Sequence, residues 1–261
     1  MNDQGRQTVT LKSTFIALTY PNYRFWYVGQ MISLVGTWMQ SSAQGFYAFE
    51  ITKSKAFLGT VSLAQGIPSI LFMLVAGVLA ERFSRRMLII VTQVWLMLLA
   101  MILAVLVFLK IAEPWHILVI SFFTGTANAM STPARHAIVA DLVEAKALNN
   151  AISLNSSMFN LGTSIGPMVG GFVYKAAGPA WCFLFNSVSF LAMIAGMAMM
   201  KLAPRQKQVP GPKKHPLHEL KDGLAYVAGH SRILTIIIIT GVFSFFGFSL
   251  VSLFPAWAKD V

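Results

Sequence analysis

The sequence predicts an all-α membrane protein, with six transmembrane helices in one bundle and a seventh after a linker. Of its 261 residues, 56% are hydrophobic and 11% are charged, whereas about a quarter of the residues in a soluble domain are charged. The apolar residues form seven runs, each close to the roughly 20 residues that cross a bilayer as a helix. These runs are 25–49, 57–80, 87–109, 115–134, 147–173, 180–200 and 233–255.

Basic residues lie in the short segments between these runs and set the expected orientation. A cytoplasmic N-terminus places 15 of the 20 basic residues inside, and leaves outside only Lys53, Lys55, Lys110, Lys175 and Lys259. The net charge of +11 is therefore explained by membrane topology, and we expect no nucleic acid partner. Residues 1–24 are expected to be a cytoplasmic segment carrying a short helix on the bilayer surface.

Residues 201–232 interrupt the series of apolar runs. Prolines and a glycine stand among lysines over 204–214, and the stretch from His218 to Tyr226 is amphipathic. This pattern predicts a cytoplasmic linker with one surface helix. The six-helix bundle then covers 25–200, and 233–261 begins a second, incomplete bundle. The six spans divide into two triplets of opposite topology, which is a 3+3 inverted repeat.

Two spans carry their polar residues on one helical face, at steps of three and four. They are Gln30, Ser33, Thr37, Gln40 and Gln44 in the first span, and Ser121, Thr124, Asn128, Ser131 and Arg135 in the fourth. Polar side chains at membrane depth are costly unless they face protein or water. The stripes indicate a hydrated cavity, although polar residues that join helices by hydrogen bonds give the same pattern. The expected substrate contacts are Thr37, Gln40, Gln44, Thr124 and Asn128.

The fifth span combines many polar residues with a glycine face. It holds Asn149, Asn150, Ser153, Asn155, Ser156, Ser157 and Asn160. We expect neighbouring helices to shelter this segment. Gly162, Gly166 and Gly170 stand four apart, which lets another backbone approach, and Pro167 bends the helix. Tight packing and sliding of helices need the same residues, so both roles remain open.

No residue pattern in the sequence supports catalysis or metal binding. There is no nucleophile, base and orienter set, no phosphate-binding glycine loop and no metal-ligand spacing, and Cys182 is the single cysteine. We expect no enzyme activity, no cofactor and no metal. Glu50, at the outer end of the first stripe, is the acidic residue nearest to the expected cavity, and an ordinary helix-end carboxylate is its alternative role.

The junction after the second span carries a recognisable motif. It reads Gly77-Val78-Leu79-Ala80-Glu81-Arg82-Phe83-Ser84-Arg85-Arg86. This segment resembles the signature loop between helices two and three of the major facilitator superfamily, except that Glu81 replaces the usual Asp and Ser84 the usual Gly. Other segments, among them 22–25, 33–39 and 133–135, are similar to the branch that contains enterobactin-type siderophore exporters and macrolide efflux proteins.

The resemblance implies a twelve-helix fold of which this chain covers the first half-bundle, the linker and the seventh helix. A second half-bundle would then be its missing partner. In this superfamily the first and fourth helices line the central cavity, and charged residues on the cytoplasmic side hold one conformation. The corresponding conformational latch would comprise Gly77, Glu81, Arg85, Arg86, Arg135 and Asp141. The fifth span also resembles, in part, the glycine-rich antiporter motif of the family.

Together these features predict a secondary transporter in a bacterial inner membrane. We expect efflux of a small amphipathic organic molecule by alternating access, driven by the proton gradient. Methionines and aromatic residues in the spans, with no buried charge in the visible cavity, favour such a substrate over a sugar or an ion. The alternatives are a membrane receptor or assembly partner that does not transport, and a facilitator or importer of a small solute.

Overall fold

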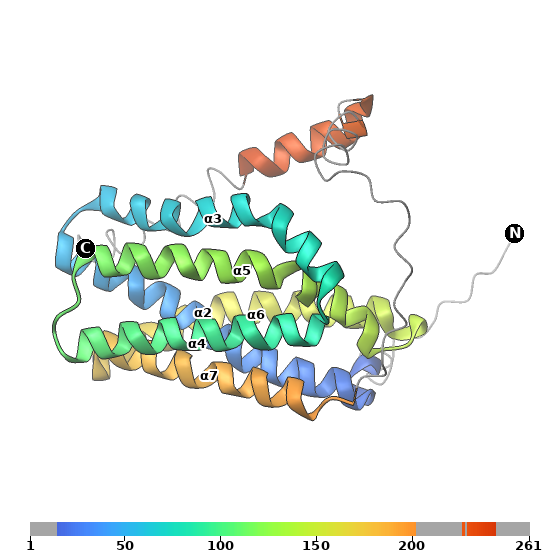
Figure 1. The fold of residues 1–261 in the computed structure, drawn as a ribbon, viewed down its shortest axis with the longest axis horizontal. Helices are drawn as coiled ribbons and strands as arrows, with labels where there is room; N and C mark the ends of the chain where they lie inside the picture. The colour runs from blue at the N-terminus through green and yellow to red at the C-terminus, as the bar shows by residue number, and fades with distance from the viewer. Residues whose placement is uncertain (1–14, 202–225, 228, 244–261) are drawn as a thin grey trace, which may run out of the picture.

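A computed structural model describes residues 15–201, 226–227 and 229–243 of the chain. They include a short 3-10 helix, η1 (Ile16–Thr19), and six long helices. These are α2 (Pro21–Thr52), α3 (Lys55–Arg82), α4 (Arg85–Phe108), α5 (Pro114–Leu142), α6 (Ala145–Ala177) and α7 (Pro179–Met199). The long helices run side by side in one bundle (Figure 1), and a shorter apolar helix, Ser231–Phe243, lies on the α3 side. Most of the predicted linker and the end of the predicted seventh span lie outside the described residues.

Local sequence explains several helix ends. Pro21, Pro114 and Pro179 begin α2, α5 and α7, where the missing N–H has no partner to lose. The Met87 N–H donates to the Ser84 hydroxyl at 3.2 Å, so Ser84 caps the start of α4. Ser84 has a φ of −64°, and the junction between α3 and α4 therefore does not require the glycine that is usual at this place.

Helices α2 and α5 extend beyond the predicted spans. α2 begins at Pro21 instead of residue 25, and α5 ends at Leu142 instead of residue 134. Hydropathy detects the part of a helix that lies in the hydrocarbon layer, so polar and charged helical ends such as 135–142 escape it.

The η1 segment is held against the bundle at the start of α2. It packs against α2 and α6, the Ala17 N–H donates to Asn150 Oδ1 at 3.0 Å, and Ala17 is fully buried. A single helical turn is too short to present a wide apolar face to lipid, whereas hydrogen bonds can hold it against protein. The expected position of this segment at the bilayer surface stays a prediction.

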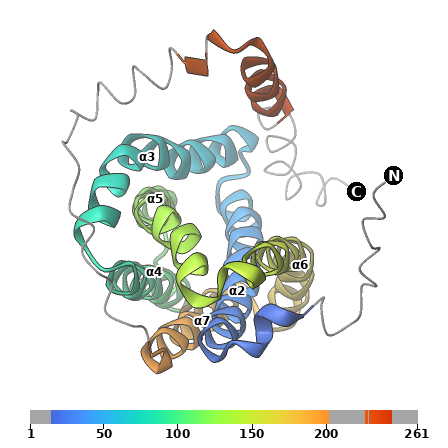
Figure 2. The ribbon, with the colours of Figure 1, turned by 90° about the vertical axis from the view of Figure 1, so that its right-hand side faces the viewer.

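The helix contacts follow the predicted inverted repeat. α3 packs along α5 and α2 along α6; α2 packs along α7 and α4 along α5; and α4 packs along α7. Exchanging α2 with α5, α3 with α6 and α4 with α7 converts each of these pairs into another pair of the same set. Figure 2, which looks along the bundle, shows this arrangement, with α5 between α3 and α4 and with α2 between α6 and α7. The fold is thus the expected six-helix half-bundle of 3+3 helices.

The apolar core lies between the helices in two main clusters. One surrounds Trp26 and Met193 near the N-terminal end of α2, and the other surrounds Leu103 and Phe183 near its C-terminal end. In the part of the chain that the structure describes, three helices contain windows long and apolar enough to cross a membrane: Lys55–Phe72, Arg85–Phe108 and Pro179–Met199. α2, α5 and α6 are at least as long, and polar rows lower their hydropathy.

Candidate functional site

The polar stripe of α2 is directed toward other helices of the bundle. Asn186 Nδ2 on α7 donates to Gln40 Oε1 at 2.7 Å, and Gln44 Nε2 donates to Ser121 Oγ on α5 at 2.8 Å. Gln40 is only 8% exposed, while Gln44 is half-buried. Both side chains therefore join helices, and the structure favours this role over contact with a cavity most clearly at Gln40.

The same pattern continues toward the N-terminal end of α2. Ser33 Oγ lies 3.5 Å from Gln93 Oε1 on α4, and Arg135 Nη1 on α5 donates to Gln30 Oε1 at 3.3 Å. The Thr37 hydroxyl donates to the Ser33 carbonyl at 2.8 Å, which satisfies it within its own helix. The stripe thus links α2 to α4, α5 and α7. It does so through polar side chains, which lower the mean hydropathy of the span.

A groove of about 310 Å³ lies between α3 and α5 and contains Asn128. Its walls include Ser69, Ala129, Thr132 and Pro133. The Ser69 hydroxyl bonds carbonyls of both helices, and the Thr132 hydroxyl donates to the Asn128 carbonyl at 2.7 Å. The side-chain amide of Asn128 has no hydrogen-bond partner among the described residues. Two donors and an acceptor in this groove can therefore bind a polar group of a ligand.

Thr124 lies one helical turn before Asn128 on α5 and is likewise half-buried. Because residues four apart share a helix face, Thr124 and Asn128 can contact the same ligand. Of the five expected substrate contacts, the structure thus brings Thr124 and Asn128 together at an accessible surface of α5. Thr37, Gln40 and Gln44 lie along α2, where their described hydrogen bonds are within the bundle.

Helix α6 presents a polar row on the outside of the half-bundle. The row consists of Asn149, Ser153, Ser157, Asn160 and Ser164, which recur at steps of three and four and are all exposed. The three serine hydroxyls donate to carbonyls one turn earlier, at 2.9 to 3.0 Å. The helices of the described bundle leave this row uncovered, so the expectation that neighbouring helices shelter it stays a prediction. Their helical spacing could have identified the row, because it separates them from the glycine face of the same helix.

The glycine face of α6 is buried against α2. Gly162, Gly166 and Gly170 are all buried, and a Cβ added at Gly166 would lie 3.0 Å from the Val35 carbonyl oxygen. Pro167 lies inside the helix next to this face. α6 therefore has two opposed sides, one fitted closely to α2 and one polar and exposed.

Two of the predicted latch residues connect helices at one end of the bundle. Arg85 Nη1 on α4 donates to Asp141 Oδ2 and to the Ala137 carbonyl on α5, both at 2.7 Å. Arg86 donates to the carbonyls of Ala198 and Met200 at the end of α7, at 3.0 and 3.2 Å. Adjacent arginines thus tie α4 to two different helices.

The other latch residues are Gly77, Glu81 and Arg135. α3 includes the backbone of Gly77 and Glu81, but the side chain of Glu81 lies outside the described residues. Arg135 contacts Gln30 on α2, as given above. Arg135 and Asp141 are about one and two-thirds turns apart, so they leave different faces of α5. Among the described hydrogen bonds, none joins Arg135 to the pair formed by Arg85 and Asp141, and its role in the latch stays a prediction.

Comparison with known proteins agrees with this architecture. Residues 12–261 match the model of the family MFS_3, described as transmembrane secretion effector. Similar proteins include the staphyloferrin A transporter of Staphylococcus aureus, 23% identical over 91% of this chain and 59% of the relative. Macrolide efflux protein A of Streptococcus pyogenes is 21% identical, over 91% of this chain and 58% of the relative.

The enterobactin exporter EntS of Escherichia coli O1:K1 is 24% identical over 93% of this chain and 57% of its own length. The chain thus spans less than two thirds of the length of these relatives, which carry the names of transporters and not of enzymes. The family model covers nearly the whole chain, and the fold and the loop after α3 have the features expected of it. The chain belongs to the transmembrane secretion effector family of the major facilitator superfamily.

Proposed function

We propose that this chain forms one half of a secondary transporter that exports a small amphipathic organic molecule. The observation that carries the proposal is the exposed polar row of α6. The α3/α5 groove, whose walls are mainly apolar, adds the side-chain amide of Asn128. Such a surface is unfavourable in contact with lipid. A second half-bundle facing it would enclose a hydrated path between the two halves, and rocking of the halves would give alternating access.

The proposed substrate class follows from the character of this surface and from the relatives. Polar residues of α6 alternate with exposed Phe159, Leu161 and Met168, so the face can bind molecules with both apolar and hydrogen-bonding groups. The relatives are named for staphyloferrin A, macrolides and enterobactin. Thr124 and Asn128 are the proposed first contacts, with Thr37, Gln40 and Gln44 behind them on α2.

The proposed location is a bacterial inner membrane with the N-terminus in the cytoplasm. Arg24, Arg85, Arg86, Lys146 and Lys201 lie at the end of the bundle where α2 begins, and such an excess of positive charge is typical of the cytoplasmic side. The same end carries the ion pair between Arg85 and Asp141. We propose that this pair belongs to a latch that must open when the halves rock.

Transport in sealed vesicles containing the complete transporter tests the proposal. We expect an imposed proton gradient to drive uphill movement of a siderophore-like or macrolide-like compound. Asn128→Leu removes the hydrogen-bonding groups from the groove and should lower the apparent affinity about 3- to 10-fold. Thr92→Val, which alters a buried hydroxyl that bonds only carbonyls of α4, is the control.

The outcomes separate the proposal from its alternatives. Binding without flux would indicate a receptor or an assembly partner. Flux that only equilibrates the compound, or that accumulates it on the cytoplasmic side, would indicate a facilitator or an importer. Unchanged affinity in Asn128→Leu would exclude the α3/α5 groove as the binding site.

A further inference from the structure

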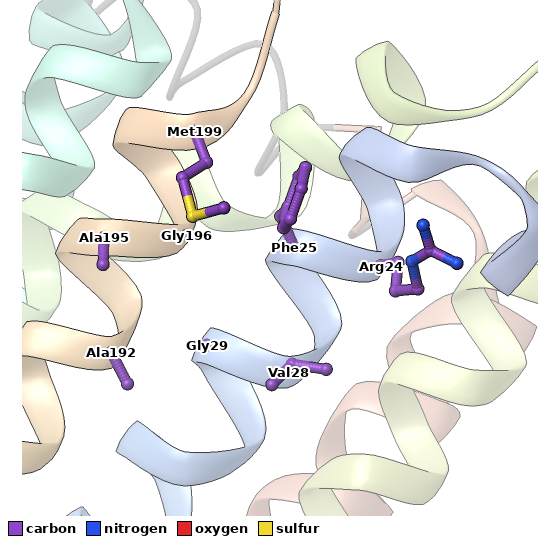
Figure 3. Close-up of a pocket in the computed structure, with 8 residues that line it drawn as sticks. All are labelled: Arg24, Phe25, Val28, Gly29, Ala192, Ala195, Gly196 and Met199. Carbon is purple, nitrogen blue, oxygen red and sulfur yellow. The ribbon is translucent and has the colours of Figure 1, made fainter.

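A second groove lies on the outside of the bundle, between the first part of α2 and the last part of α7. It has a volume of about 310 Å³ and is lined by Arg24, Phe25, Val28, Ala192, Ala195 and Met199. Figure 3 shows the two helices side by side, with Arg24 on α2 next to Phe25 and Val28 and farther from α7 than they are. We call this feature the α2/α7 groove.

The groove exists because small residues bring the two backbones together. A Cβ at Gly29 would lie 2.9 Å from the Ala192 carbonyl oxygen, and one at Gly196 would lie 2.7 Å from the Phe25 carbonyl oxygen. Ala192 and Ala195 add only methyl groups on the α7 side. The larger rim residues, such as Val28 at 53% exposure, rise beside a shallow apolar trough.

One positive charge, on Arg24, lies beside the groove near the start of α2. The exposed Arg24 forms no ion pair with any described residue. The ion pairs among the described residues join Arg85 to Asp141 and Lys146 to Glu144. The Asn22 side chain exchanges two hydrogen bonds with the Lys201 backbone, at 3.0 and 3.1 Å, and so ties the start of α2 to the end of α7. An apolar groove is thus flanked by an exposed arginine that has no ion-pair partner among the described residues.

We propose that the α2/α7 groove binds an anionic glycerophospholipid, with an acyl chain in the trough and the phosphate on Arg24. From Ala192 to Met199, the helix rise of 1.5 Å per residue gives a trough of about 10 Å, which suits the upper part of an acyl chain. Arg24 lies in the second turn from the start of α2, where a membrane helix meets the headgroup layer. Basic side chains at this level favour anionic lipids, by about 1 kcal/mol per residue, or about fivefold.

The site is separate from the proposed transport path. In Figure 2 the α2 and α7 ends that form the groove lie on the side of the bundle away from α3 and from the Ser231–Phe243 helix. The lipid proposal does not depend on whether the protein transports a substrate or on which way the chain is inserted in the membrane. It depends only on an apolar trough and a positive charge at the membrane boundary. Bound lipid would brace α2 against α7, the pair that also holds the Gln40–Asn186 hydrogen bond.

Native mass spectrometry of the purified protein in neutral detergent tests the proposal. Phosphatidylglycerol and phosphatidylcholine with identical acyl chains are titrated in competition. We expect the wild-type protein to retain phosphatidylglycerol at least fivefold better, and Arg24→Gln to lose about fivefold of this preference. Ala195→Phe fills the trough and should reduce retention of phosphatidylglycerol. Lys110→Gln removes an exposed cation at the opposite end of the bundle and should change nothing.

A photoreactive group attached at Ala195→Cys, in a Cys182→Ala background, identifies the occupant directly. Crosslinking to phosphatidylglycerol supports the proposal. Crosslinking to a second copy of the protein would overturn it, and so would a wild-type lipid preference in both Arg24→Gln and Ala195→Phe. Because Arg24 is exposed, the Arg24→Gln variant should fold normally. The lipid preference of Arg24→Gln therefore tests the proposal even if Ala195→Phe fails to fold.

Discussion

Arg85 connects α4 to α5 with one guanidinium group, which bonds both a carboxylate and a main-chain carbonyl. The hydrogen bond to the Ala137 carbonyl does not depend on a charged residue of α5. The ion pair with Asp141 is an additional interaction, which is lost when either side chain loses its charge. Its carboxylate is 42% exposed, compared with 19% for the arginine side chain. Water therefore weakens the ion pair, and a modest energy is expected from it.

A double-mutant cycle with Arg85→Ala and Asp141→Ala measures that energy. We expect a coupling of about 0.5 to 1 kcal/mol in the free energy of unfolding, typical of a partly exposed pair in good geometry. The cycle formed by Glu144→Ala and Lys146→Ala is the control. Lys146 lowers the pKa of Glu144 through a hydrogen bond, but both side chains are exposed, so no measurable coupling is expected. Equal couplings in the two cycles would contradict the special role of the Arg85 pair.

At the scale of one helix, α6 combines a close-packed glycine face with an exposed polar row. The glycine face can be tested with two substitutions of the same kind. Gly166→Ala places a methyl group 3.0 Å from the Val35 carbonyl oxygen, whereas Gly171→Ala places one in open space. We expect Gly166→Ala to destabilise the bundle by about 1 to 3 kcal/mol through overpacking. Gly171→Ala should be neutral or stabilising, by up to about 1 kcal/mol, because alanine favours the helix.

Thermal unfolding of both variants in the same detergent provides the measurement. If the two variants unfold at the same temperature, the close approach of α6 to α2 is not important for stability.

The sequence predicts the helices better than it predicts what their polar faces contact. Apolar runs locate α3, α4 and α7, and the steps of three and four identify α2 and α5 as helices with one polar face. The period does not reveal whether such a face meets water or another helix. Gln40 proves to bond Asn186 inside the bundle, while Ser157 on the more polar α6 is exposed. That difference depends on which helices pack together, which the sequence of one helix does not contain.

At the scale of the whole molecule, the half-bundle has surfaces of two kinds. α4 and α7 expose mainly apolar residues, among them Val188 and Leu191. α6 exposes its polar row, and α3 and α5 contain the groove with Asn128. The central claim is that the first surface faces lipid and the second faces a hydrated path. The two surfaces are equally open in the isolated chain, so only their surroundings in the membrane distinguish them.

Thiol labelling of single-cysteine variants in native membranes tests this claim most directly. In a Cys182→Ala background, we expect Ser157→Cys and Asn160→Cys to react with a membrane-impermeant, water-soluble thiol reagent, because their side chains meet water. The wild-type residues Val188 and Leu191 are 52% and 49% exposed in the isolated chain. We expect Val188→Cys and Leu191→Cys not to react, because these positions face lipid. Equal protection of all four positions, or faster reaction at Val188→Cys and Leu191→Cys, would contradict the account.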